Sequence, residues 1–278
     1  MAGLLVVAIC VALGGVAVWF VSTSARRAHR MLAVVGNATR VAHPEYRVRL
    51  QPPEGMFSLT LPLSVERQSS GSSSGRQDVV ENPLGDLTVV PSFPSTDLTR
   101  YLREFTGGQG PDPAVKKAAE REIGELGDAM WATALVELAR PLAEPDLLDE
   151  MKPYGFGPQG WDKYFFMSPA GPGTKPVFWS TLDSCAERGL DGCDDHSATK
   201  QFQQWVGLLT DDDRSNLRRL GLDSDVLREA AADGHVYGFM VNWMTKEDLL
   251  GLLAKPAVRD IRVVEAVPRS SGRRGAGN

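Results

Sequence analysis

The chain has 278 residues, of which 42 % are hydrophobic, and this apolar content is enough for a folded core. Its formal net charge is −5, although residues 26–49 hold six Arg against one Glu and the tail from Arg269 holds three Arg and no acidic residue. The intervening residues 50–268 are therefore acidic and lack the basic face that phosphate binding requires. This composition argues against nucleic acid as a partner.

An uncharged apolar run near the N-terminus extends from Leu4 to Val21. As a helix, its 18 residues would be about 27 Å long, which just spans the hydrocarbon core of a bilayer. Trp19 lies near the end of the run, where an aromatic side chain suits the headgroup region. The sequence predicts one transmembrane anchor within residues 1–25, with the lipid bilayer as a partner.

Two other interpretations of this run stay open. The first is a signal peptide cleaved near the small residues 22–25, although no Lys or Arg precedes the run and its apolar core is longer than usual. The second is a buried helix of a soluble core, although the run is apolar all round. A retained anchor with three residues before it leaves no room for an N-terminal effector domain.

Arg26, Arg27 and Arg30 follow the apolar run directly. The positive-inside rule would place the residues after the anchor in the cytoplasm. The basic juxtamembrane segment 26–45 can also lie against anionic lipid headgroups, at about 1 kcal/mol per basic residue. We expect Arg26 and Arg27 to belong to the membrane-anchoring region.

Two further sections follow, a β-rich section at 46–92 and an α+β domain at 93–268. Ser69 to Gly75 has the composition of a flexible linker or loop tip, and the tail 269–278 is predicted to be disordered. Alternation and apolar density predict strands at 46–51, 56–65, 87–90, 130–138 (ended by Pro141) and 164–166. Apolar periodicity and capping residues predict helices at 31–40, 98–105, 113–126, 144–151, 198–209 and 215–232.

The C-terminal part of the α+β domain has the clearest pattern. A strand at 236–243, a helix at 245–253 and a strand at 258–264 follow one another within 30 residues. Thr245 and Asp248 have the spacing of a capping box at the start of the helix. The pattern predicts a βαβ unit with two parallel neighbouring strands, and hence a ferredoxin-like α+β sandwich.

Three motifs between residues 130 and 265 have the order found in one bacterial family. They are ATALVELARPLAEPDLLDEM at 132–151, an aromatic Gly/Pro-rich middle followed by a helix, and VYGFMVNWMTKEDLLGLLAKPAVRDIRVV at 236–264. This part of the chain resembles the C-terminal extracytoplasmic domain of bacterial anti-sigma factors (sigma factor regulator C-terminal type). The resemblance implies a membrane-tethered sensing or interaction domain outside the cytoplasm.

The chain departs from that family in two places. Asn242 and Trp243 stand where the family usually has a Gly after the valine of the strand. The family's cytoplasmic sigma-binding domain precedes its membrane span, whereas three residues precede the apolar run here. The side of the membrane stays undecided, because the resemblance favours the outside and the Arg cluster favours the cytoplasm.

Cys185 and Cys193 lie eight residues apart in CAERGLDGC, with two Gly between them that allow a turn. Outside the cytoplasm we expect a disulfide between them, and inside two ordinary thiols. The contiguous run 193–196 (CDDH) offers metal-ligand types but not separated segments, so a polar loop capped by Asp195 or Ser197 is the preferred interpretation. Asp211 to Asp213 are expected at a helix N-terminus.

No nucleophile elbow, dinucleotide fingerprint or phosphate-binding Gly loop with Lys is present in the sequence. We therefore predict no catalytic, cofactor or metal residue. An aromatic concentration, however, lies in the Gly/Pro-rich region. These residues form either a core under loops or a surface for a partner or ligand, and the candidate surface comprises Trp161, Tyr164, Phe165, Phe166 and Trp179.

The leading hypothesis is a membrane-anchored, non-catalytic regulatory or sensing protein of bacterial type, which binds another protein or an envelope ligand. One alternative is a membrane-tethered enzyme with a site at residues 153–200 that gathers His196 with Asp194 or Asp195. Another is a scaffold that faces the cytoplasm.

Overall fold

The structure is a computed structural model that describes residues 24–55, 57–67, 73–154, 164–170, 175–181, 184–193 and 197–269. The predicted anchor, with Leu4, Trp19 and Val21, lies outside these ranges. Within them, none of the helices combines the length and the apolar character that a membrane crossing needs.

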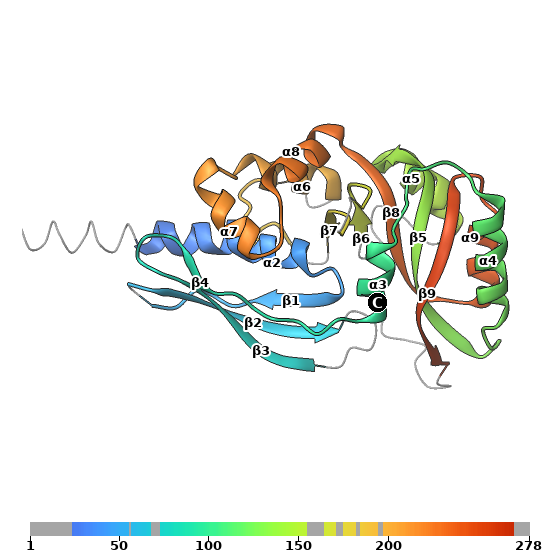
Figure 1. Cartoon of the computed structure of the whole chain (residues 1–278), viewed down its shortest axis with the longest axis horizontal. Coiled ribbons are helices and arrows are strands. Elements are labelled where there is room, and N and C mark those ends of the chain that lie inside the picture. Colours follow the sequence, from blue (N-terminus) through green and yellow to red (C-terminus); the bar gives the residue numbers. More distant parts are fainter. Residues whose placement is uncertain are drawn as a thin grey trace, which may run out of the picture.

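The first described element is a long helix from residue 24 to residue 42, which we call the entry helix. It is α-helical at its start, continues as the π-helical η1 (Met31–Gly36) and ends as α2 (Asn37–Ala42). In Figure 1 it lies between a β-sheet and a group of helices. The predicted helix 31–40 is confirmed, and the structure extends it in both directions.

The sheet against the entry helix has four antiparallel strands, in the order of the sequence. They are β1 (Tyr46–Leu50), β2 (Leu59–Arg67), β3 (Ser73–Glu81) and β4 (Leu87–Val89). The predicted strands at 46–51, 56–65 and 87–90 are confirmed. The flexible segment predicted at 69–75 is wrong from Ser73 onward, because the polar start of β3 pairs with β2 through its backbone.

A second antiparallel sheet has five strands in the order β7-β6-β8-β5-β9. They are β5 (Met130–Ala143), β6 (Tyr164–Phe166), β7 (Phe178–Ser180), β8 (His235–Met244) and β9 (Val258–Pro268). β5 is antiparallel to both β8 and β9, so those two strands run parallel with β5 between them. The prediction of parallel neighbours is therefore wrong.

The helix between β8 and β9 explains the gap between them. This helix, α9 (Lys246–Leu253), contacts both β5 and β9. A helix is about 10 Å wide, close to two strand spacings of about 4.8 Å, so it covers an intervening strand without strain. The capping box of Thr245 and Asp248 at its start is confirmed.

Pro141 does not end β5, contrary to the prediction. Pairing with β9 stops at Leu138, whereas pairing with β8 continues through Leu142 and Ala143 after a register shift. Pro141 thus lies where one side of the strand needs no hydrogen-bond donor.

Five of the remaining helices fall into two groups. In Figure 1, α4 and α9 cover the outer face of the five-stranded sheet, and α6, α7 and α8 lie over the entry helix. The bounds of the remaining helices are α3 (Asp97–Arg103), α4 (Pro113–Gly124), α5 (Glu144–Met151), α6 (Ala198–Gly207), α7 (Arg214–Arg219) and α8 (Ser224–Asp233), with short 3₁₀ turns η2 (Lys152–Tyr154) and η3 (Asp211–Asp213).

The fold is mixed α+β, as the sequence predicts, and both of its sheets are antiparallel. One hydrophobic cluster contains Leu61 of β2, Trp205 of α6 and Leu252 of α9, so it joins the predicted sections 46–92 and 93–268. A smaller cluster lies between α3 and the other face of the five-stranded sheet.

Candidate functional site

The entry helix is built into the body along one face. Met31, Val34, Val35, Ala38 and Val41 are each at most 5 % exposed and belong to the main core. They pack in a socket, which we define as the surface formed by β1–β4, by η3 and α7, and by the loop 185–193. Any displacement of this helix therefore has to disturb packed side chains on several elements.

Two ion pairs fix the first turns of the entry helix to opposite walls of the socket. The Arg27 guanidinium lies 3.0 Å from Glu81 of β3 and donates to the Asn82 carbonyl at 2.9 Å. The Arg30 guanidinium lies 2.6 Å from Asp213 of η3. Arg27, which the sequence assigns to the membrane-anchoring region, thus has partners within the protein. Arg26 is exposed.

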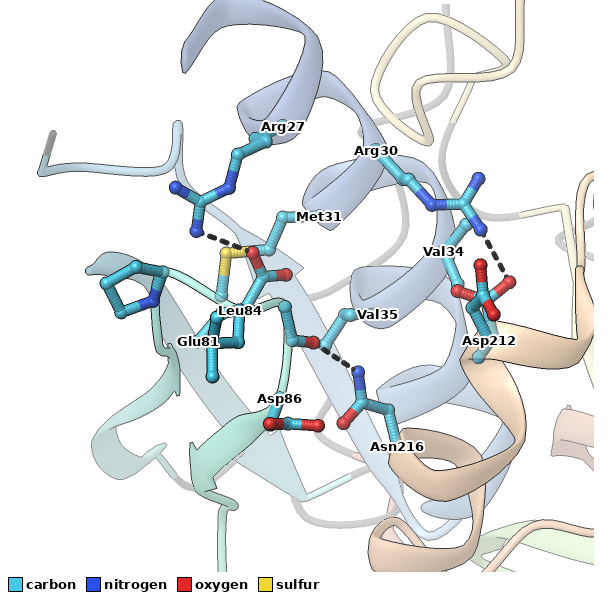
Figure 2. Close-up of a pocket in the computed structure, with 13 residues that line it drawn as sticks. Arg27, Arg30, Met31, Val34, Val35, Glu81, Leu84, Asp86, Asp212 and Asn216 are labelled. Carbon is cyan, nitrogen blue, oxygen red and sulfur yellow. Dashed lines mark hydrogen bonds and ion pairs between the residues drawn. The ribbon is translucent and has the colours of Figure 1, made fainter. Parts of the chain in front are cut away.

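A cavity of about 300 Å³ lies between these walls. Figure 2 shows Arg27 and Arg30 on the entry helix above it, with Asp86 and Asn216 below. Asn216 donates to the Gly85 carbonyl at 2.7 Å and accepts from the Leu87 amide at 2.9 Å, and so joins α7 to the β3–β4 turn. The lining is of mixed charge.

A buried polar network closes the other end of the socket. The Asn37 side-chain carbonyl accepts from Arg40 at 3.2 Å and from Arg188 at 3.1 Å, and its amide donates to the Arg188 carbonyl at 2.9 Å. Arg188 is 1 % exposed and stacks over Trp179, with 4.5 Å between its guanidinium carbon and the ring centroid. Hydrogen bonds to charged groups of this kind contribute about 1.5–3 kcal/mol each.

Arg188 is presented by a disulfide-closed loop. Cys185 and Cys193 are bonded, with 5.9 Å between their Cα atoms, as the sequence predicts for an oxidising compartment. Gly189 has a φ of +65°, and a Cβ there would lie 3.3 Å from Ala33 of the entry helix. The loop thus lies directly against the helix.

The aromatic residues predicted as a possible partner surface belong to the core. Tyr164, Phe165, Phe166 and Trp179 are each at most 6 % exposed. They alternate along β6 and β7, so that Phe165 and Trp179 enter the main core, while Tyr164 and Phe166 enter the cluster under α3. The partner-surface interpretation is wrong for these four, and Trp161 lies outside the described residues.

The polar motifs have local capping roles where they are described. Ser197 is the N-cap of α6, and Asp213 completes a capping box with Thr210. In the described ranges, no group of three or more His, Cys, Asp or Glu could hold a metal ion. Asp194, Asp195 and His196 lie outside those ranges, so the enzyme alternative stays a prediction.

Several buried carboxylates were not singled out in the sequence, and two of them, Glu144 and Glu137, each accept hydrogen bonds from more than one donor. Glu144 accepts from Ser197 Oγ at 2.8 Å and from the Ala198 and Thr199 amides at 3.1 and 2.9 Å. Glu137 accepts from the amide and hydroxyl of Thr106, both at 2.9 Å. Glu144 caps a helix whose N-cap residue lies 53 residues later in the chain, and no local sequence pattern predicts a contact over that separation.

No protein-family model matches this chain, and the searches of curated proteins and of solved structures each found no similar protein. The resemblance of residues 130–265 to the anti-sigma factor domain therefore stays a prediction.

Proposed function

We propose that this protein is a membrane-anchored, non-catalytic regulatory or sensing protein whose body binds another protein or an envelope ligand outside the cytoplasm. One observation carries the proposal. The apolar run Leu4–Val21 is followed, from residue 24, by a helix that is built into the core of the body. Binding that shifts the socket would therefore move the chain that enters the membrane.

The disulfide favours the outside of the cytoplasm, because such bonds persist in oxidising compartments. The argument for a cytoplasmic location was that Arg26, Arg27 and Arg30 follow the apolar run, as the positive-inside rule describes. Arg27 and Arg30 form ion pairs within the body, which supplies a reason for their presence other than topology.

The five-stranded sheet contains the βαβ pattern from which the sequence predicts a ferredoxin-like sandwich. β8, α9 and β9 enclose β5 in a split β-α-β unit, the arrangement of ferredoxin-like domains. The four-stranded sheet is part of the socket against which the long entry helix packs.

The test begins with a strain of the native cells from which the gene has been deleted, and the transcript profile of that strain is recorded. Three forms of the full-length protein are then expressed in it. We expect the wild type and Arg26→Gln to restore the profile. A double change, Arg27→Gln with Arg30→Gln, should remain folded and in the membrane but fail to restore it, because the entry helix loses both ion pairs.

Arg26→Gln is the matched control, since it removes an exposed Arg from the same turn. Full restoration by the double variant would contradict signalling through the entry helix. A deletion that leaves the transcript profile unchanged would contradict a regulatory role altogether.

A further inference from the structure

The two most exposed large hydrophobic side chains in the described ranges lie at the same end of the body. Leu84 is 88 % exposed and lies in the turn between β3 and β4. Phe57 is 65 % exposed and lies in the connection between β1 and β2. In Figure 1 both connections reach the end of the sheet where the entry helix begins.

Arg27 joins these two connections to the entry helix. Its Nη1 donates to the Phe57 carbonyl at 3.3 Å, and its Nη2 donates to the Asn82 carbonyl, two residues before Leu84. Leu84 lines the same cavity as Arg27 (Figure 2). Phe57 and Leu84 thus belong to connections that contact the first turns of the entry helix.

The end of the apolar run is close to this point. From Val21 to Ser24, three residues cover at most about 11 Å of chain, and the helical turn from Ser24 to Arg27 adds about 4.5 Å. Arg27 therefore lies within about 15 Å of the last residue of the run. The interfacial layer of a bilayer is about 5–7 Å thick on each side.

We propose that Phe57 and Leu84 form a membrane-contacting face and insert into the bilayer interface beside the anchor. The proposal rests on the membrane anchoring proposed above. An exposed Leu and an exposed Phe that lie in solvent would otherwise each keep an unfavourable apolar surface in water. Insertion would orient the body with its five-stranded sheet away from the lipid.

The apolar side chains, and not the charges, are expected to drive the contact. Arg26 is exposed at this end, but so are the acidic Asp86 and Asp212. Their opposite charges leave little net attraction for anionic headgroups. The face should therefore contact zwitterionic and anionic membranes alike.

The test uses the full chain in vesicles of phosphatidylcholine, with and without phosphatidylglycerol. In a Cys10→Ala background, single Cys residues replace Phe57, Leu84 or, as a control, Trp243, and carry an environment-sensitive nitrobenzoxadiazole label. Trp243 is a matched control, because it is 55 % exposed but lies on β8 of the other sheet. Flotation measures anchoring separately.

We expect labels at 57 and 84 to emit at shorter wavelength and to be quenched by lipids with a doxyl group near the headgroup, in both vesicle types. The label at 243 should show neither change. Quenching no stronger than at 243, in protein that floats with the vesicles, would overturn this face and leave the anchoring intact; it would indicate a protein partner for the apolar pair. Failure to float would overturn the anchoring itself.

Discussion

Glu137 lies on β5 with 3 % of its surface exposed, and burial raises the pKa of its carboxyl, although hydrogen bonds from Thr106 oppose the shift. Asp260, which lies opposite Glu137 on the neighbouring strand β9, raises the pKa further. The folded state thus binds this proton more tightly than the unfolded chain does. The contribution of Glu137 to stability is present below its ordinary pKa of 4.5 and is lost as the pH rises through the raised value.

Glu137→Gln should therefore be at least as stable as the wild type at pH 7, because the amide oxygen can still accept from Thr106 without a buried charge. Its advantage should shrink as the pH falls toward 4.5. Glu137→Leu should lose about 1–3 kcal/mol, since it leaves the Thr106 donors without that acceptor. Urea unfolding at several pH values measures both effects. If the free energy of unfolding of the Gln variant, taken relative to wild type, were lower at pH 7 than at pH 5, the raised pKa of Glu137 would be contradicted.

Trp243 is the one non-glycine residue in the described ranges with a positive φ, at +58°. Trp243→Gly and Trp243→Ala both remove the indole, so the difference between them reports the backbone alone. We expect the Gly variant to be more stable by about 1 kcal/mol in thermal or urea unfolding. Equal stability would show that the positive φ costs nothing here.

The Glu144 side chain joins α5 to α6, because its carboxylate accepts hydrogen bonds from the N-terminal amides of α6. An anion at this position also complements the helix dipole. Glu144→Ala should lower the free energy of unfolding by about 2–3 kcal/mol, and Glu144→Gln by about 1 kcal/mol, because the amide keeps one acceptor. Denaturant unfolding gives both values, and an Ala variant no worse than Gln would indicate that solvent replaces the carboxylate.

The elements that could be predicted from the sequence are those fixed by neighbours in the chain. The capping box of α9, the helix start at Asp211–Asp213 and the N-cap of α6 each depend on residues within one helical turn. The strand order of the five-stranded sheet could not be predicted, because it depends on β5 pairing with strands about 100 residues further on. β3 was not predicted either. Its side chains at the start are polar, and the strand forms because its backbone pairs with β2.

The candidate site depends even more on long-range contacts. The sequence predicted a Cys185–Cys193 bond for a location outside the cytoplasm and two thiols for a location inside. It gave no sign that the loop would place Arg188 against Asn37, 151 residues earlier. It also marked Arg27 and Arg30 as basic residues beside an anchor, with no sign of Glu81 or Asp213 as their partners. The aromatic concentration did not distinguish a core from a surface, because both use the same residues.

The whole body is stabilised by the disulfide, because the loop it closes holds Arg188 in the socket. The bond joins residues that are eight apart in the sequence. By restricting the unfolded chain, it should add about 2.5 kcal/mol to the free energy of unfolding. Reductant, or Cys185→Ser with Cys193→Ser, should therefore lower the free energy of unfolding by at least that amount. Cys10→Ser serves as the control and should change nothing. A stability indifferent to reductant would mean that the bond does not form in cells.

We propose that the body of this protein, anchored in the membrane, lies outside the cytoplasm. Glu120 is exposed on α4, far along the chain from the proposed membrane face, so Glu120→Cys in a Cys10→Ala background offers one accessible thiol while the disulfide is intact. We predict that a membrane-impermeant maleimide labels this residue in intact cells, on protein that stays in the membrane fraction after carbonate washing. Labelling only after lysis would place the body in the cytoplasm and contradict the proposed location.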